Sequence, residues 1–148
     1  MKFYIASKLE NAETVKKVAN VLKAAGHSHT YDWTTHGSVK EITGNKKESI
    51  DRLTQVAESE RKGVLDADIL VVLLPGGRGT HVELGIALGA DNRNIIICAE
   101  THEFFECDDK TCAFYWNKGI IRIAGTFDIW VAGILKVGFD LDSQAQAG

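Results

Sequence analysis

Residues 74–89 read LPGGRGTHVELGIALG, and this stretch decides the fold. It overlaps the end of the most apolar run of the chain, DADILVVLLP at 66–75. That run does not alternate between apolar and polar residues, so it predicts a central strand covered on both faces. Pro75, the only proline of the chain, predicts where the strand ends. The apolar run, the glycine-rich turn and the helical pattern THVELGIALGA at 80–90 together predict one βα unit of a parallel sheet.

The rest of the chain alternates strand and helix patterns in the same way. Strands are predicted at 3–7, 27–33, 94–99 and 119–124, and helices at 11–26, 46–62 and 126–139, with a loop at 34–45. Short connections imply a parallel sheet with helices on both faces. We therefore expect a single α/β domain over residues 1–148, a flavodoxin- or Rossmann-like three-layer sandwich with strand order 2-1-3-4-5 and a disordered tail at 143–148. Such a fold binds ligands beyond the carboxyl ends of its strands.

Composition narrows the class of protein further. The 148 residues carry a net charge of −3 and no basic stripe, which argues against nucleic acid as a partner. We expect no membrane segment, because no apolar run approaches ~20 residues, and the N-terminus lacks a signal-peptide pattern. The three cysteines, Cys98, Cys107 and Cys112, do not form a disulfide framework, so we expect reduced thiols in the cytoplasm.

The glycine turn has a functional and a structural interpretation. Gly76, Gly77 and Gly79 permit close approaches that a Cβ would prevent, and the helix N-terminus that follows offers free N–H groups. An anion or an oxygen-rich ligand could bind there. The glycines could also do no more than make a tight strand-to-helix turn.

Glu83 interrupts an otherwise apolar helix start and also has two interpretations. Thr80 and Glu83 match the Thr-x-x-Glu capping box, in which the glutamate binds the N–H of the cap residue. The alternative is a carboxylate that lines a cleft, because an unpaired buried charge is very costly. The helix N-terminus favours the ionised form, so we expect a carboxylate rather than an acid.

The runs YIAS at 4–7 and DADILVVLLPGGRGTHVELGIALG at 66–89 resemble the nucleoside 2-deoxyribosyltransferase-like family. That family includes the deoxyribosyltransferases and the nucleoside 5′-monophosphate N-glycosidases. The order of elements fits over nearly the whole chain, but only the central block is specific. The resemblance implies cleavage of the N-glycosidic bond of a (deoxy)nucleoside or its 5′-monophosphate. We expect neither a cofactor nor a metal.

The resemblance also implies two catalytic roles. It makes Glu83 the nucleophile that attacks the anomeric carbon and forms a glycosyl-enzyme, a role that suits a carboxylate facing an oxocarbenium-like centre. It makes Glu60, with Glu58 as a neighbouring competitor, the acid that protonates the departing base. A solvated charge on the helix surface is the alternative for Glu60.

One position departs from the transferase pattern. Deoxyribosyltransferases typically carry an aspartate in the turn, where this chain has Gly77 followed by Arg78. The absence of this aspartate argues against transfer of the sugar between free deoxynucleosides. It favours a substrate with a 5′-phosphate, as in the nucleoside 5′-monophosphate glycosidases. The expected phosphate contacts are Ser7, Gly77, Arg78, Gly79 and Thr80, with Lys8 as a further candidate. A hydrolase and a non-catalytic nucleotide-binding module both remain open.

Aromatic residues supply candidate contacts to the base. Trp33 could stack on a nucleobase at the edge of the cleft or pack within the protein. The connection at 100–118 is long, and long connections are commonly functional. In the family this loop reaches the active site of a neighbouring subunit, so we expect a homodimer or larger homo-oligomer in which Phe114, Tyr115 and Trp116 are the candidate contacts to the base. Alternatively, they are buried in their own subunit. His27, His29 and His36 lack the spacing of a metal site.

Overall fold

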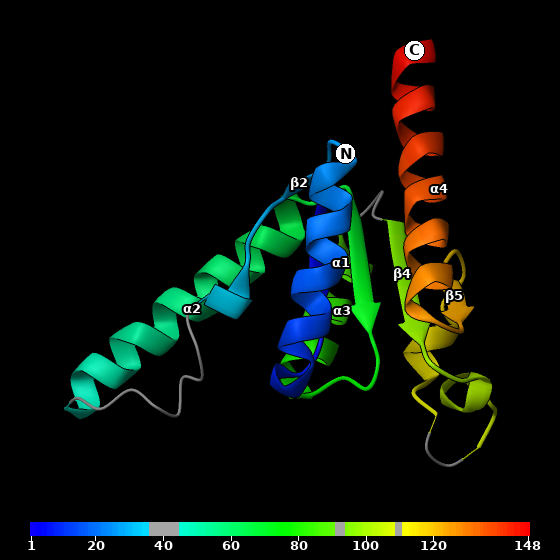
Figure 1. Cartoon of the computed structure of the whole chain (residues 1–148). Coiled ribbons are helices and arrows are strands. Elements are labelled where there is room, and N and C mark those ends of the chain that lie inside the picture. The colour runs from blue at the N-terminus through cyan, green and yellow to red at the C-terminus, as the bar shows by residue number, and fades with distance from the viewer. Residues whose placement is uncertain (36–44, 91–93, 109–110) are drawn as a thin grey trace.

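The computed structural model describes residues 1–35, 45–90, 94–108 and 111–148. Its centre is a parallel five-stranded sheet with the order β2-β1-β3-β4-β5, shown in Figure 1. The strands are β1 Lys2–Ala6, β2 Ser28–His29, β3 Ile69–Leu73, β4 Asn94–Ala99 and β5 Ile121–Ala124. The predicted α/β class and strand order are confirmed.

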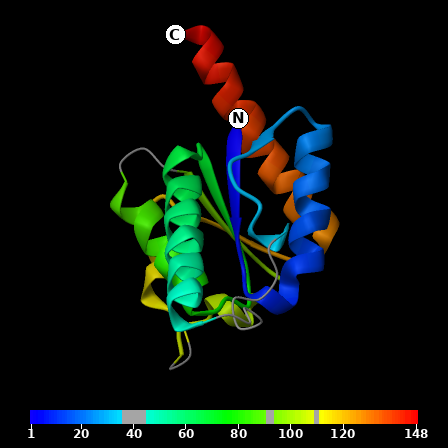
Figure 2. The ribbon, with the colours of Figure 1, turned by 90° about the vertical axis from the view of Figure 1, so that its left-hand side faces the viewer.

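Helices cover both faces of the sheet. The main ones are α1 Ala12–Ala24, α2 Lys46–Asp66, α3 Arg78–Gly89 and α4 Phe127–Ala147. Helices α1 and α4 pack together on one face, and α2 and α3 pack together on the other, as Figure 2 shows. No helix in the described ranges is long and apolar enough to cross a membrane.

The apolar run before the glycine turn forms the middle of the core. Every residue of β3 is buried, and so are four of the five residues of β1 beside it. Phe3 pairs with Ile69, which pairs in turn with Asn94 of β4. The continuous rather than alternating pattern therefore reflects a strand with helices on both sides.

The second strand is shorter than the sequence predicts, with two residues in place of 27–33. Beyond this short strand, side-chain hydrogen bonds to neighbouring elements replace the backbone hydrogen bonds between strands. The Thr30 hydroxyl donates to the Gly63 carbonyl at 2.7 Å, and the Trp33 indole N–H donates to the Ile5 carbonyl at 2.7 Å. These bonds turn the chain into the 3-10 helix η2 Trp33–Thr35.

Two helix boundaries also differ from the sequence prediction. Helix α3 begins at Arg78 with Gly77 as its N-cap, and Thr80 lies inside the first turn, where its Oγ1 accepts from the Gly77 N–H at 3.0 Å. The predicted capping box between Thr80 and Glu83 is therefore wrong, since Glu83 belongs to the second turn. Helix α4 continues through residues 143–147, where composition predicts a tail.

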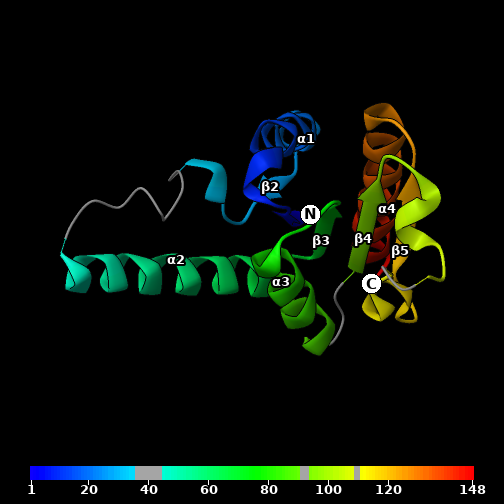
Figure 3. The same cartoon turned by 90° about the horizontal axis from the view of Figure 1, so that it is seen from below.

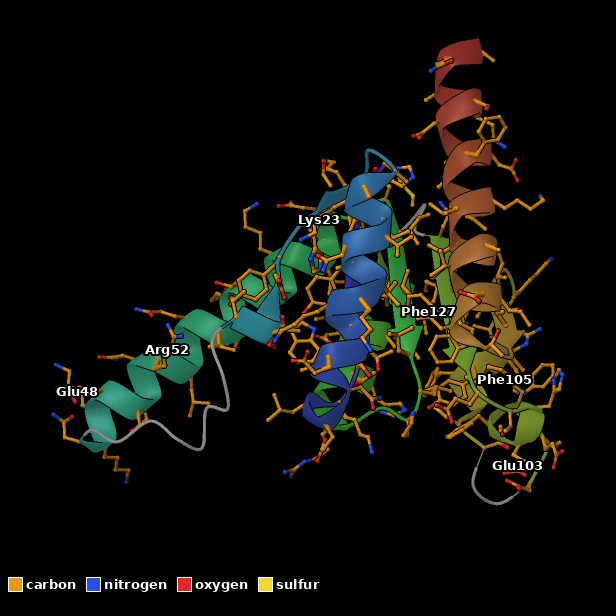
Figure 4. The ribbon with its side chains drawn as sticks, viewed as in Figure 1. Lys23, Glu48, Arg52, Glu103, Phe105 and Phe127 are labelled. Carbon is orange, nitrogen blue, oxygen red and sulfur yellow. The ribbon has the colours of Figure 1, made fainter. Side chains whose placement is uncertain are left out.

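Two helices extend away from the layered body. Figures 1 and 3 show the N-terminal part of α2 projecting sideways from the sheet. Figure 1 shows the C-terminal part of α4 extending past the end of the sheet at which the strands begin. The side chains of Glu48 and Arg52 on the projecting part of α2 point outward in Figure 4. The part of α2 that packs on the body is its C-terminal half, which holds Val56, Gly63 and Val64 as its buried residues.

Candidate active site

Glu83 is buried and bound to a tyrosine of the central sheet. Its side chain lies on α3 and is 7% exposed. The phenol of Tyr4, in β1, donates a hydrogen bond of 2.5 Å to Glu83 Oε1. Tyr4 itself is fully buried, so the bond is shielded from water. Of the two roles open to Glu83, the cap is excluded, and the lining of a cleft stays a prediction, because neither described cavity includes Glu83 in its lining.

Burial dominates the ionisation of Glu83. Loss of solvation raises the pKa of its carboxyl to about 8, the hydrogen bond from Tyr4 lowers it, and the charge of Glu60 raises it. The expectation that the helix N-terminus keeps this group ionised is therefore wrong for the unliganded protein, because burial outweighs it. Burial and the neighbouring Glu83 also raise the pKa of Tyr4, which keeps the phenol a donor.

Glu60 reaches the same region from α2. It is half-buried, and its charge contributes to the pKa of both Tyr4 and Glu83. One turn further along α2, a Cβ on Gly63 would lie 2.9 Å from the Tyr4 ring, which shows how closely the helix approaches it. Glu58 is exposed. The structure thus brings together Tyr4, Glu60 and Glu83 from three different elements.

The glycine turn lies next to this group, at the start of α3. Arg78 and Gly79 are exposed there, whereas Thr80 is buried and its hydroxyl is bound to Gly77. Lys8 is adjacent, because a Cβ on Gly77 would lie 3.7 Å from Lys8 Cβ. The turn therefore presents exposed backbone at a helix N-terminus with two cationic residues in the neighbourhood.

Ser7 forms a structural link between the ends of β1 and β3. Its hydroxyl donates to the Leu73 carbonyl at 2.7 Å and accepts from Asn11 Nδ2 at 2.9 Å. Asn11 Nδ2 also donates to the Pro75 carbonyl at 3.2 Å. The Ser7 hydroxyl thus holds the turn in place.

His81 and Tyr115 form a pair that the sequence did not indicate. His81 Nδ1 lies 2.7 Å from the Gly77 carbonyl, and Nε2 lies 2.7 Å from the Tyr115 hydroxyl. A carbonyl only accepts, so Nδ1 donates, and in the neutral ring Nε2 accepts from Tyr115. Tyr115 is thus buried in its own subunit, which was one of its two expected environments. Phe114 beside it is 62% exposed.

Trp33 is part of the core in this structure. Its side chain is 6% exposed, and its indole N–H donates a hydrogen bond to the Ile5 carbonyl. Of the two alternatives for Trp33, the structure shows packing within the protein. His36 lies outside the described residues. Within the described ranges no group of three or more histidine, cysteine, aspartate and glutamate side chains is arranged to hold a metal ion.

A cavity of about 640 Å³ lies beside the start of α3, at the carboxyl end of β3. It is bounded by the end of β3, by Gly76 of the glycine turn, by His81 and by described residues of the β4–β5 connection between Glu103 and Tyr115. Its lining does not include Tyr4, Glu60 or Glu83. The separation follows from helix geometry, because Glu83 and His81 are two residues apart and hence about 200° apart around the helix axis.

Comparison with known proteins identifies the fold. No protein-family model and no curated protein sequence matches the chain. Among solved structures, the CMP N-glycosidase BcmB of Clostridium botulinum is similar, with a TM-score of 0.58 and 14% identity, over 90% of this chain and 97% of that one. A 2-deoxyribosyltransferase from Bacillus psychrosaccharolyticus gives a TM-score of 0.57 and 19% identity, over 86% and 88% of the two chains. This chain therefore has the fold of a CMP N-glycosidase and a 2-deoxyribosyltransferase.

Proposed function

We propose that the protein cleaves the N-glycosidic bond of a nucleoside or nucleoside 5′-monophosphate through a covalent sugar ester on Glu83. The observation that carries the proposal is the buried Glu83 carboxyl held by Tyr4, with the charge of Glu60 close enough to raise its pKa. The fold shared with an N-glycosidase and a deoxyribosyltransferase, together with the sequence resemblance in the turn, supports it.

In this proposal the two oxygens of Glu83 have different tasks. Oε1 accepts the hydrogen bond from Tyr4, which fixes the orientation of the carboxylate. Oε2 is then the oxygen that attacks the anomeric carbon. As the new C–O bond forms, the C–N bond breaks and its electron pair leaves with the base, which takes a proton from Glu60. Water or a second base then attacks the same carbon and gives a proton to Glu60, while the C–O bond of the ester breaks and releases Glu83 as a carboxylate.

The reaction needs Glu83 to be ionised, although burial favours its protonated form. In the free protein at neutral pH this carboxyl mostly holds its proton. Positive charge that develops on the sugar ring beside it favours the carboxylate, as any nearby cation does. At neutral pH and without substrate, only a minority of the protein molecules therefore have Glu83 in its ionised, attacking form.

The second step distinguishes a hydrolase from a transferase. Gly77 replaces the aspartate of the transferase pattern, and Arg78 and Lys8 add positive charge at the helix start. This charge supports a 5′-phosphate substrate, with Arg78, Gly79 and the N-terminus of α3 as phosphate contacts, and the missing aspartate favours hydrolysis. A non-catalytic nucleotide-binding module with this fold is the other alternative, because fold does not determine activity.

Release of the base tests the proposal. Deoxynucleosides, ribonucleosides and their 5′-monophosphates are each incubated with and without a second base. Free sugar that forms without a second base indicates a hydrolase, and exchanged nucleoside indicates a transferase. We expect Glu83→Gln to reduce base release at least about 10³-fold and Glu60→Gln to reduce it about 10²–10⁴-fold, whereas the exposed Glu58→Gln serves as the control. Tight nucleotide binding with no release of base from any substrate would instead indicate the binding module.

A further inference from the structure

We propose that a cavity of about 600 Å³ between α1 and the start of α4 binds an amino acid with a large apolar side chain. Its volume falls in the range of about 300–1,000 Å³ typical of small-molecule sites. Helices α1 and α4 cover one face of the sheet, whereas Glu83 lies on α3, which covers the other (Figure 2). The described lining contains no residue of the glycine turn and none of Tyr4, Glu60 and Glu83, so the inference does not rest on the proposed glycosidic reaction.

The cavity lies at the carboxyl ends of β4 and β5, the edge of the sheet at which folds of this type bind ligands. Glu100 follows the last residue of β4, and Gly125 follows the last residue of β5. The Ala99 carbonyl accepts hydrogen bonds from the Gly125 N–H at 2.9 Å and from the Trp130 indole N–H at 3.0 Å. These two bonds fix the start of α4 against the end of β4, so the cavity is preformed.

The first turn of α4 supplies the apolar part of the lining. Phe127, which Figure 4 labels, lines the cavity together with Ile129 and Trp130. The Trp130 N–H is bound to the sheet, so this side chain offers the cavity only its apolar ring. Ile129 is 51% exposed and lies against Gly125, where a Cβ would be 2.8 Å from Ile129 Cδ1. A large apolar side chain in the cavity would remove these surfaces from water, which favours binding.

The charges of the lining determine the class of ligand. Lys17 of α1 and Glu100 both line the cavity and are exposed. Neither belongs to an ion pair within the part of the chain that the structure describes. Glu13, one turn before Lys17, is bound by Lys16 at 2.8 Å. An anion or a cation alone would match one of the two charges and be repelled by the other. A zwitterion matches both, with its carboxylate toward Lys17 and its ammonium group toward Glu100.

Two hydroxyl groups of the lining add hydrogen-bonding capacity. Thr126 is exposed, and its side chain makes no capping bond to α4, the helix that it precedes. Thr14 is half-buried on α1. A hydroxyl donates to a carboxylate and accepts from an ammonium group, so both residues suit the polar end of an amino acid.

Nuclear magnetic resonance of the isotope-labelled protein tests the proposal, because the backbone N–H signals of Gly125, Thr126 and Phe127 report on the cavity. The probe is L-phenylalanine. The controls are 3-phenylpropionate, which lacks its ammonium group, and the 2-phenylethylammonium ion, which lacks its carboxylate. We expect L-phenylalanine to shift these signals in a saturable way, with half-saturation at about 1 mM. Each control should bind about 3- to 5-fold more weakly, because exposed charges contribute modestly.

Two variants assign each charge of the ligand to its partner. Lys17→Gln should weaken L-phenylalanine and 3-phenylpropionate about 3- to 5-fold without weakening the ammonium ion. Glu100→Gln should weaken L-phenylalanine and the ammonium ion by the same factor without weakening 3-phenylpropionate. Lys23→Gln, which removes an exposed cation elsewhere on α1, is the matched control and should change no affinity. Glu83→Gln should also change none, so failure of the glycosidic reaction and failure of amino-acid binding are separate results.

Three results would overturn the inference. The first is the absence of saturable shifts up to about 20 mM L-phenylalanine, far above the expected half-saturation. The second is an affinity for L-phenylalanine that neither Lys17→Gln nor Glu100→Gln lowers. The third is a set of shifts centred on the glycine turn instead of the start of α4.

Discussion

At the scale of single residues, the properties of the site follow from one buried carboxyl. Burying an ionised glutamate without compensation is very costly. Glu83 is compensated in two ways, by keeping its proton at neutral pH and by accepting a hydrogen bond from Tyr4. The same two features would make its activity depend on pH, since only the carboxylate attacks the sugar.

The first prediction concerns this pH dependence. Because the reactive form has Glu83 ionised and a proton on Glu60, the two carboxyls must together hold one proton, so kcat/KM for base release should be level near neutral pH and fall above about 8, where that proton is lost. Tyr4→Phe removes the hydrogen bond that lowers the pKa of Glu83, so the midpoint should move to higher pH. Loss of a bond to a charged group should also lower the plateau about 10- to 150-fold.

Tyr115→Phe is the matched control for this prediction. It removes a buried hydroxyl that contacts His81 instead of Glu83, so the midpoint should not move. A Tyr4→Phe profile with an unchanged or lower midpoint would contradict the assigned role of Tyr4.

The second prediction concerns stability. The pKa of Glu83 rises from an ordinary 4.5 to about 8 on folding, so the folded state binds the proton more tightly. The free energy of unfolding should therefore fall as pH rises from 4.5 to 8, by at most about 1.4 kcal/mol per pH unit from this group. Glu83→Gln does not titrate, so its stability relative to the wild type should increase across that window. Urea unfolding at pH 5 and pH 8 measures the difference, and a difference independent of pH would contradict the burial of this charge.

The sequence identified Glu83 because an acidic residue in an apolar helix start stands out locally. It did not identify Tyr4 or His81 as functional partners. Tyr4 is 79 residues from Glu83 in sequence, and His81 is 34 residues from Tyr115. Neither pairing leaves a local pattern, because each depends on which strand and helix faces the fold brings together. The sequence also could not show that burial, rather than the helix N-terminus, dominates the pKa of Glu83.

At the scale of elements, the close approach of α2 to β1 positions the carboxyl of Glu60. Gly63 makes this approach possible, since a Cβ there would lie 2.8 Å from Tyr31 Cβ and 2.9 Å from the Tyr4 ring. A side chain would push α2 outward or tilt Tyr4. Either movement would disturb the group formed by Tyr4, Glu60 and Glu83.

The third prediction compares two glycines in helices. Gly63→Ala should lower the free energy of unfolding by about 1–3 kcal/mol, because it overpacks the Tyr4 ring, and it should reduce base release. Gly85→Ala, in α3, is the matched control. Its Cβ would meet nothing within 4 Å, so the change should stabilise by about 0.5–1 kcal/mol through helix propensity. Thermal and urea unfolding measure both. A Gly63→Ala protein as stable as Gly85→Ala would show that α2 does not need this contact.

Element types were predictable where the hydrophobic pattern was long. The apolar run before Pro75 predicted β3, and the glycine turn predicted the start of α3 to within two residues. The edge strand β2 was overestimated, because hydrogen bonds from Thr30 and Trp33 to distant carbonyls end it early. Such bonds are tertiary, so no local propensity records them.

At the scale of the whole molecule, several large apolar side chains remain outside the core. Ile50 and Leu53 are 51% and 49% exposed on the projecting part of α2, and Phe139 is 70% exposed on α4. Ile50 and Leu53 are three residues apart and so share one side of their helix. Exposed apolar side chains grouped in this way are typical of association surfaces.

The fourth prediction is that the chain self-associates through the projecting part of α2. Light scattering after size exclusion should give the mass of a dimer or larger oligomer at micromolar concentration. Ile50→Glu combined with Leu53→Glu should shift the mass toward that of the monomer, because it places charge on the contact. Arg52→Gln, about 100° or more around the helix axis from both of these residues, should leave the mass unchanged. A monomeric wild type at every concentration would contradict the prediction.

The central claim is that Glu83 becomes covalently bound to the sugar. Protein quenched with acid during turnover of a substrate that releases its base can be digested, and the peptide carrying Glu83 weighed by mass spectrometry. We predict an added mass of one sugar on Glu83, absent without substrate and absent in Glu83→Gln. Full base release by Glu83→Gln, or a sugar adduct on a different residue, would contradict the account.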